Sequence, residues 1–388
     1  MIALYKSVPG PGNVSLQDRP EPVLNSVNNV LVRVEACAVC GMDFHIYHGK
    51  FPCTPPFIMG HELIGVVELV EGGAGTVQPG DRVTAQPHLY ACGRCPACKM
   101  GLTQLCAQTR SLGIHRDGAM ASYVAVPESC LHIVPQDVPT SQAAILEPFS
   151  MVLGNFGIPI EQQAMETAVV MGAGQVGLLG VAAARACGAK QIILCGRTQD
   201  TALGFPAAEQ LGATTLIDTD RDDAVAQVLS MTGGVGADIV LEASGASACI
   251  NAAMAMVKPG GLITVMGGTR QDTVPVTWDV CLRKAVRVCF HMKSKHRLTM
   301  VNTPLNKALG VRNQIFHSSD TRSAVAWTWE RMMSATCRRS SKSMLSQLPR
   351  WADRNSIFCG ETLSAFNAAI SLISPWRRVS SSSIFPLA

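Results

Sequence analysis

The sequence predicts an α/β protein built from a mostly β domain, a doubly wound parallel sheet and an irregular C-terminal segment. Short β-rich runs fill the first 150 residues, strands and helices alternate from residue 167, and this alternation stops near residue 290. Because 47% of the 388 residues are hydrophobic and 15% are charged, the chain can bury roughly two to three cores. We expect domains at residues 1–152, 153–290 and 291–388.

Residues 1–152 consist of short predicted strands separated by glycine and proline turns. The β-rich runs are "NVLVRVEACAVC", "ELIGVVELV" and "DRVTAQPHL". The stretch "VQPGDRV" places a Pro-Gly turn immediately before the last of them. These runs are typical of a domain whose core is made by β-strands.

Residues 153–290 alternate between strand and helix. "TAVVM" predicts a buried strand, "GAGQVG" a glycine turn, "LLGVAAARACG" a helix that ends at Gly188, and "QIILC" the next strand. The pattern continues with "TTLI", a helix near 222–231, "ADIVLEA", a helix near 246–257 and "GLITVMGG". Alternation at this spacing predicts a parallel, doubly wound sheet.

Residues 291–388 differ in composition from the rest of the chain. They contain four of the five tryptophans, 17 serines and only two of the 34 glycines. They carry 14 basic and 4 acidic residues, whereas residues 1–290 carry 18 basic and 24 acidic residues. No alternating core pattern runs through this atypical tail, so we expect it to add little ordered core. A divergent helical segment and a shifted reading frame both stay open as its origin.

The chain carries no pattern for export or for membrane insertion. Its first residues, "MIALYKSVPGPG", lack the regions of a secretory signal. The most apolar stretch, Ala168 to Ala186, contains four glycines and an arginine, which argues against a membrane span. Fifteen cysteines in such a chain favour reduced thiols and metal binding. We expect a cytoplasmic protein without a membrane or nucleic-acid partner, because no basic stripe extends beyond "CRRSSKS".

Four cysteines lie within the fifteen residues of "CGRCPACKMGLTQLC". Cys92, Cys95, Cys98 and Cys106 supply four thiolates, enough to complete a tetrahedron around one Zn²⁺. Glycines and a proline between them allow the sharp turns that such a short loop needs. Because a four-sulfur site has no vacant position, we predict a structural zinc site here.

A second set of ligand types lies upstream, in "CAVCGMDFHIYHG" and "PFIMGHELIGVV". Cys40, His61 and Glu62 offer one thiolate, one imidazole and one carboxylate, a mixed set typical of zinc sites that keep a position for water or substrate. By themselves these three residues are also explained by a buried cysteine and a core histidine.

The turn "VVMGAGQVG" has the form of a dinucleotide-binding turn between a strand and a helix. Gly172 allows the tight turn, Gly174 lets a pyrophosphate approach the backbone, and Gly177 lets the helix pack on the strand. The next strand ends in Gly196 and Arg197, where an NAD site usually has a carboxylate. A guanidinium there suits the 2′-phosphate of NADP, so we expect NAD(P) with NADP favoured.

Taken in this order, the mixed-ligand set, the cysteine loop and the glycine turn resemble the zinc-dependent medium-chain dehydrogenases, which include alcohol, sorbitol and threonine dehydrogenases. The matching motifs within residues 1–290 are "CGMDFH", "GHE", "PGDRV", "CGRCPACKMGLTQLC", "LEPFS" and "GAGQVG". The resemblance implies a GroES-like first domain, a Rossmann sheet, two zinc ions per chain, and a homo-oligomer (dimer or tetramer) if residues 291–388 fold.

The resemblance also implies roles for individual residues. Cys40 and His61 would ligate the catalytic zinc, with Glu62 as the third protein ligand. Glu147 of "LEPFS" would lie by the metal, as ligand or as partner of the bound water. His45 would be the relay histidine, and Asp43 its neighbouring acid.

One position departs from the family pattern. Members usually carry Ser or Thr two residues after the zinc cysteine, where the hydroxyl passes a proton toward the relay histidine. Here that position is Met42, which has no exchangeable proton. Either a water or substrate hydroxyl reaches His45, or Glu62 or Glu147 acts as the base.

The sequence thus predicts an oxidoreductase that transfers a hydride between a secondary alcohol and NAD(P). A polyol, sugar or sugar acid is the expected small-molecule substrate, ahead of threonine-type amino alcohols and simple diols. The alternative is a catalytically impaired, zinc-stabilised nucleotide-binding protein, which the Met42 substitution and the atypical tail would favour.

Overall fold

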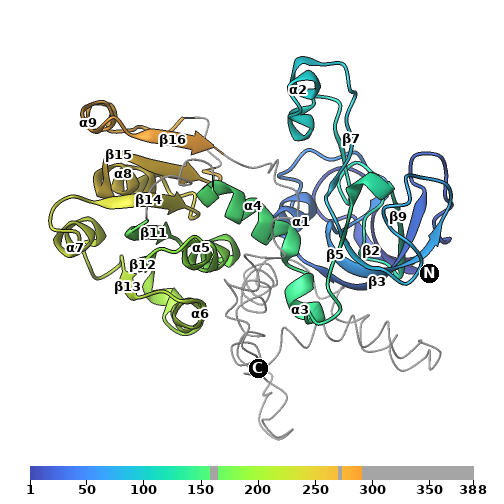
Figure 1. Ribbon diagram of the computed structural model, residues 1–388, viewed down its shortest axis with the longest axis horizontal. Coiled ribbons are helices and arrows are strands. Elements are labelled where there is room, and N and C mark those ends of the chain that lie inside the picture. The colour runs from blue at the N-terminus through green and yellow to red at the C-terminus, as the bar shows by residue number, and fades with distance from the viewer. Residues whose placement is uncertain (158–164, 270–272, 291–388) are drawn as a thin grey trace, which may run out of the picture. The chain divides into compact units, whose positions relative to one another are not determined.

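The computed structural model describes residues 1–157, 165–269 and 273–290 (Figure 1). The expectations for residues 291–388 concern a segment that lies outside the described residues. Within the described part of the chain, no helix is long and apolar enough to cross a membrane.

The N-terminal part of the chain is built from antiparallel strands in three sheets. The largest sheet has five strands in the order β10-β6-β5-β3-β9, a second has the order β2-β1-β4, and β7 pairs with β8. The strands of the three sheets are β1 (Ile2–Lys6), β2 (Val14–Asp18), β3 (Val30–Ala38), β4 (Phe57–Ile58), β5 (Glu62–Val70), β6 (Arg82–Ala85), β7 (His88–Tyr90), β8 (Arg110–Ser111), β9 (Tyr123–Val126) and β10 (Leu131–Ile133). The β-rich runs of the sequence are therefore strands, as predicted.

The core of this part is made by side chains from alternate positions of its strands. Val30 and Val32 of β3 belong to the same buried cluster as Leu63 and Val67 of β5, and all four are almost fully buried. Alternation of this kind places one set of side chains on the covered face of a sheet.

Short helices connect or follow these strands. They are α1 (Gly41–Tyr47), α2 (Pro96–Lys99), α3 (Thr140–Ala143) and α4 (Leu146–Gly157), with 3-10 turns η1 (Thr103–Leu105) and η2 (Glu128–Cys130). Helix α4 runs across the predicted domain boundary at 152/153, and this boundary stays a prediction. The helix contacts both β5 and α5.

The second part of the chain contains a six-stranded sheet in the order β13-β12-β11-β14-β15-β16, with every neighbouring pair parallel. The strands are β11 (Thr167–Met171), β12 (Gln191–Gly196), β13 (Thr215–Asp218), β14 (Ala237–Glu242), β15 (Val257–Val265) and β16 (Arg287–Phe290). The helices are α5 (Gln175–Ala186), α6 (Gly204–Leu211), α7 (Ala224–Met231), α8 (Ser247–Met256) and α9 (Trp278–Lys284), with the 3-10 turn η3 (Thr198–Asp200). Since the strand order reverses beside β11, this is the doubly wound arrangement that the sequence predicts.

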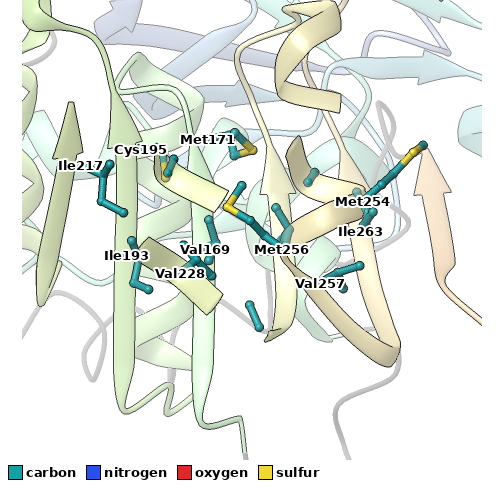
Figure 2. Close-up of a cluster of buried hydrophobic side chains, with 14 residues drawn as sticks. Val169, Met171, Ile193, Cys195, Ile217, Val228, Met254, Met256, Val257 and Ile263 are labelled. Carbon is teal, nitrogen blue, oxygen red and sulfur yellow. The ribbon is translucent and has the colours of Figure 1, made fainter. Parts of the chain in front are cut away.

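Helices cover both faces of this sheet. Figure 2 shows one face, where Val169 and Met171 of β11 pack with Val228 of α7 and Met254 of α8. On the other face, an ideal Cβ on Gly180 of α5 would lie 3.5 Å from the side chain of Val170. All five residues of β11 are buried, because both faces are covered.

The sequence did not predict every element of the second part. Helix α6 contains Pro206 in its first turn, a position where proline loses no helical hydrogen bond. Strand β15 begins at Val257 and includes the "KPGG" stretch that looks like a turn. Both cases show the parallel sheet and its helices overriding local turn signals.

Candidate active site

Pairing of β3 with β5 brings the mixed-ligand residues together. In the antiparallel register Ala38 lies opposite Glu62, and Cys40 follows just after the end of β3. The candidate ligand atoms of Cys40, His61 and Glu62 lie within 4.8 Å of one another. His61 is 5% exposed and Glu62 is 1% exposed. The fold therefore assembles a half-buried thiol, a buried imidazole and a buried carboxyl group from the ends of two neighbouring strands.

The first turn of α1 places Asp43 behind His61. The backbone N–H of Cys40 donates to Oδ2 of Asp43 at 2.9 Å, which caps the helix. The other oxygen, Oδ1, lies 3.8 Å from Nδ1 of His61. A carboxylate at this position orients an imidazole whose other nitrogen can bind a metal. The sequence identified Asp43 only as a neighbouring acid, although the C-x-x-D spacing of a helix cap indicates its orientation.

The cluster holds more acidic groups than basic ones. Neither oxygen of Glu62 accepts an N–H or O–H hydrogen bond within the described residues, and the Cys40 thiol lies beside it. Burial, reinforced by the nearby carboxyl groups of Glu147 and Asp43, raises the pKa of Glu62 to about 8. Burial also raises the pKa of Cys40, of Asp43 and of Glu147.

A divalent cation would correct both features of this cluster. It would supply the positive charge that the buried acids lack and a partner for the carboxylate of Glu62. One thiolate, one imidazole and one carboxylate form a donor set that zinc accepts. The residues present therefore fit a zinc ion.

Glu147 lies in the first turn of α4, close to the cluster but outside the set of atoms within 4.8 Å. Burial by itself lowers the pKa of His61, yet the charges of Asp43, Glu62 and Glu147 raise it above its ordinary value. Glu147 therefore acts on the imidazole through space. Helix α4 contacts β5 and β6, and this contact positions its N-terminal turn.

The backbone before His61 is held by a loop that the sequence analysis did not identify. Gly60 has a φ of 92°, and an ideal Cβ there would lie 2.5 Å from the side chain of Met120. The backbone N–H of Ala119 donates to the carbonyl oxygen of Gly60 at 3.0 Å. Only glycine fits this position. A glycine immediately before a His-Glu pair is the sequence signal that points to it.

The relay position is occupied differently from the family pattern. His45 lies in the last turn of α1 and is half-buried. Met42 lies in the first turn and packs against an apolar cluster. The buried members of this cluster are Ile46, Phe57, Met59 and Ile114. Met42 therefore contributes packing at a position where the family usually carries a hydroxyl.

The four cysteines of the "CGRCPACKMGLTQLC" loop come together, as their spacing predicts. Their sulfur atoms lie within 4.8 Å of one another. The backbone N–H of Cys95 donates to Sγ of Cys92 at 3.4 Å, and that of Cys92 donates to Sγ of Cys106 at 3.4 Å. Backbone N–H groups from Arg94 and Cys95 lower the pKa of Cys92 to about 6. These donors stabilise thiolates, so the loop fits a structural zinc ion.

The glycine turn lies between β11 and α5, at the edge where a nucleotide binds in this type of sheet. Gly172 has a φ of 104°. An ideal Cβ on Gly177 would lie 1.8 Å from the carbonyl oxygen of Gly172, whereas one on Gly174 would meet no atom within 4 Å. The turn thus leaves open backbone at Gly174, next to the N-terminus of α5, where a pyrophosphate fits.

Arg197, which follows β12, forms an ion pair with Asp220. Its Nε donates to both carboxylate oxygens of Asp220, at 3.0 and 3.2 Å. The expectation of NADP rested on the absence of a carboxylate at the strand end and on the guanidinium that follows it, and the structure pairs this guanidinium with Asp220. Asp220 follows β13, and this pairing was invisible in the sequence because it joins two different strand ends.

Comparisons with known proteins match both parts of the chain. Residues 26–136 match the alcohol dehydrogenase GroES-like domain, and residues 176–300 match the zinc-binding dehydrogenase family. An L-threonine 3-dehydrogenase of Symbiobacterium thermophilum is 37% identical over 281 residues, which cover 69% of this chain and 75% of the relative. A sorbitol dehydrogenase of Bacillus subtilis is 33% identical over 268 residues, covering 68% and 74%.

A comparison with solved structures also finds a zinc-binding dehydrogenase. The crystal structure described as a zinc-binding dehydrogenase of Sinorhizobium meliloti, bound to NADP, superposes with a TM-score of 0.72 at 31% identity. The match covers 80% of this chain and 88% of that one. These matches confirm the GroES-like and Rossmann prediction, and with it the resemblance drawn from the motifs. The chain belongs to the zinc-dependent medium-chain dehydrogenase family.

Proposed function

We propose that this chain oxidises a secondary alcohol of a polyol, sugar or sugar acid at a zinc centre formed by Cys40, His61 and Glu62. Its class follows from its family: it is a zinc-dependent oxidoreductase that transfers a hydride between an alcohol and NAD(P). The observation that supports the proposed centre is the Cys40–His61–Glu62 cluster, whose buried carboxylate has no N–H or O–H donor within the described residues. The comparisons do not favour the impaired nucleotide-binding protein.

The residues of the cluster divide the work between them. Zinc, when bound, supplies a Lewis acid that lowers the pKa of the alcohol. Asp43 lies 3.8 Å from Nδ1 of His61 and acts on the imidazole through its charge. Glu62 and Glu147 bring negative charge close to the centre, so a neutral alcohol is bound more easily there than a further anion.

We assign the exit of the substrate proton to His45. Glu62 is 1% exposed and cannot pass a proton directly to solvent, whereas His45 is half-buried on α1. Since Met42 has no proton to transfer, a substrate hydroxyl or a water has to bridge to His45. A substrate with several hydroxyl groups can provide that bridge itself, and this favours polyols and sugars over simple alcohols.

The glycine turn holds the cofactor. NAD(P), when bound, accepts the hydride. The open backbone at Gly174 and the N-terminus of α5 bind the pyrophosphate, because the first N–H groups of a helix have no partner within it.

The test is a steady-state assay of NAD(P)H formation with the full-length protein. The substrate panel holds polyols, sugar acids, L-threonine and simple diols. We expect turnover with polyhydroxylated substrates, loss of turnover after chelation, and recovery when zinc is restored. Turnover that resists complete zinc removal would contradict the proposed centre, and a preference for L-threonine would contradict the proposed substrate class.

Two further expectations remain part of this proposal. We propose a homo-oligomer on the basis of the resemblance, which light scattering would test. We propose a cytoplasmic location on the basis of the cysteine content, which cell fractionation would test.

A further inference from the structure

We propose that the carboxylates of Asp200 and Asp220 make this chain select NAD(H) over NADP(H). This inference rests on the proposed nucleotide site at the glycine turn. It concerns the end of β12, the strand next to β11 in the sheet. The backbone N–H of Gly172 donates to the carbonyl oxygen of Cys195 at 2.7 Å, so this strand end lies directly beside the turn.

Asp200 places a carboxylate where the strand end itself has none. The backbone N–H of Arg197 donates to Oδ2 of Asp200 at 2.8 Å. An ideal Cβ on Gly196 would lie 3.2 Å from the same oxygen. Asp200 therefore returns from the following 3-10 turn into the space beside Gly196. This is the region in which a carboxylate accepts hydrogen bonds from the ribose of NAD.

The contacts of Gly204 tie Asp200 to the glycine turn. An ideal Cβ on Gly204 would lie 2.9 Å from Cβ of Ala173 and 3.3 Å from Cβ of Asp200. Gly204 thus packs between the turn residue and the acid, with no room for a side chain. The carboxylate is held close to the nucleotide turn by this packing.

Asp220 occupies two donors at the end of β12 that a 2′-phosphate could otherwise use. It accepts hydrogen bonds from Nε of Arg197 and, at 3.1 Å, from the backbone N–H of Thr198. The hydroxyl of Thr198 donates to Asp218 at 2.6 Å. The arginine at the other strand end, Arg221, lies 3.5 Å from Asp218. Both guanidinium groups in this region are thus paired with carboxylates.

The charge balance of this region opposes a 2′-phosphate. Three carboxylates face two guanidinium groups, so the region is already negative before a nucleotide enters. A 2′-phosphate would add roughly two negative charges beside Asp200 and would compete with Asp220 for Arg197. A ribose 2′-hydroxyl adds no charge and can donate to a carboxylate. The same residues that favour NAD therefore also disfavour NADP.

The structure also explains why a carboxylate cannot be supplied at position 196 itself. An ideal Cβ on Gly196 would lie 2.4 Å from Cε1 of Phe205, a side chain that is 8% exposed. Gly196→Asp would collide with this ring. Asp200 reaches the same region without entering that space.

The test is a fluorescence titration of the full-length protein with NADH and with NADPH. We expect NADH to bind at least about tenfold more tightly, the scale of one charge-assisted hydrogen bond. The variant Asp220→Asn removes one charge and releases Arg197, so NADPH should bind about tenfold more tightly than to the unmodified protein. The affinity for NADH should change little.

Two controls separate this mechanism from a general charge effect. Asp222→Asn removes the same charge from an exposed side chain two residues away, and should leave both affinities unchanged. In the double variant Arg197→Ala/Asp220→Asn the gain in NADPH affinity should disappear. Equal gains in the two Asp→Asn variants, or tighter NADPH binding by the unmodified protein, would overturn the inference alone. A protein that binds neither nucleotide would contradict the proposed function and this inference with it.

Discussion

The two cysteine-containing clusters of the chain differ in where their ligands come from and in whether the ligand atoms accept hydrogen bonds. Two of the four sulfurs in the cysteine loop, those of Cys92 and Cys106, accept backbone N–H groups from their own short segment, and three of the four cysteines are half-buried. The Cys40–His61–Glu62 cluster is assembled from two strand ends, and its carboxylate has no N–H or O–H donor among the described residues. The first is a closed set made by local chain turns; the second is an open set made by the fold.

The number and type of ligands therefore distinguish a structural from a catalytic metal site even when no metal is bound. Four thiolates fill a tetrahedron and leave no position for a substrate. Three mixed ligands leave one position, and the pKa of the acid among them, Glu62, is raised by burial and by the neighbouring carboxyl groups of Glu147 and Asp43. Removing a ligand should therefore affect stability at one cluster and chemistry at the other.

The largest expected effect is the loss of activity on substitution of Cys40. Cys40→Ala should reduce kcat/KM by about a thousandfold or more, since metal stabilisation of the reacting oxygen is worth several kcal/mol. Thermal unfolding should change little, and zinc content should fall from two ions per chain to one. The matched control is Cys53→Ala, a half-buried cysteine outside both clusters, which should retain activity and both ions.

Substitution in the cysteine loop should give the opposite pattern. Cys95→Ala opens the closed set, and the free energy of unfolding should fall by about 3 kcal/mol or more because metal binding contributes directly to folding. The fraction of protein that stays folded should keep its kcat. Chemical denaturation followed by circular dichroism measures the first quantity, and active-site titration the second. A large loss of kcat per folded molecule with unchanged stability would contradict the assignment of this loop.

The sequence was sufficient for the motifs and for most of the elements that depend on local spacing, with α6 and the first residues of β15 as exceptions. The cysteine loop, the glycine turn and the alternation from β11 to β15 were predicted, because each is encoded within a few consecutive residues. The family resemblance then joined Cys40 to His61 and Glu62, which spacing alone could not do.

The sequence could not show contacts between strand ends that are far apart along the chain. The pairing of Arg197 with Asp220 joins β12 to the turn after β13, and the return of Asp200 to Gly196 depends on a 3-10 turn. The first of these bears on the choice between NAD and NADP, which the sequence indicated only through Gly196 and Arg197. Side-chain pairing across parallel strands is set by the register, which no pattern along one strand reveals.

A second buried glutamate sharpens the contrast with Glu62. Glu128 is 5% exposed but accepts hydrogen bonds from the Thr76 side chain and from backbone N–H groups of the 74–77 loop. The Thr76 hydroxyl and these N–H groups lower the pKa of Glu128 below its usual value despite burial. The donors make Glu128 a structural anchor, whereas Glu62 has no N–H or O–H donor among the described residues and is proposed to bind a cation.

Glu128→Gln should lower the free energy of unfolding by about 2 kcal/mol near neutral pH, the scale of hydrogen bonds to a charged group. Since the folded-state pKa lies below the unfolded one, this stabilisation is present above roughly pH 4.3, the unfolded value, and is lost as the pH falls through the folded value. The difference between variant and unmodified protein should therefore shrink in acid. Urea unfolding at a series of pH values measures it, and a difference that does not vary with pH would contradict the anchor role.

The smallest expected effect concerns Met42. This residue lies two positions after Cys40 and packs against the apolar cluster around Ile46 and Phe57. Met42→Leu conserves volume against Ile46 and Phe57, so the free energy of unfolding should change by less than about 1.5 kcal/mol and kcat should be retained.

Met42→Thr adds the hydroxyl that the family usually carries. If the proton already leaves through His45 by way of a substrate hydroxyl, this variant should lose packing without gaining kcat on polyols. On a simple alcohol, which lacks that hydroxyl, the added side chain should raise kcat. A gain of the same size on both substrates would show that the missing hydroxyl limits the reaction generally, and would contradict a bridge supplied by the substrate.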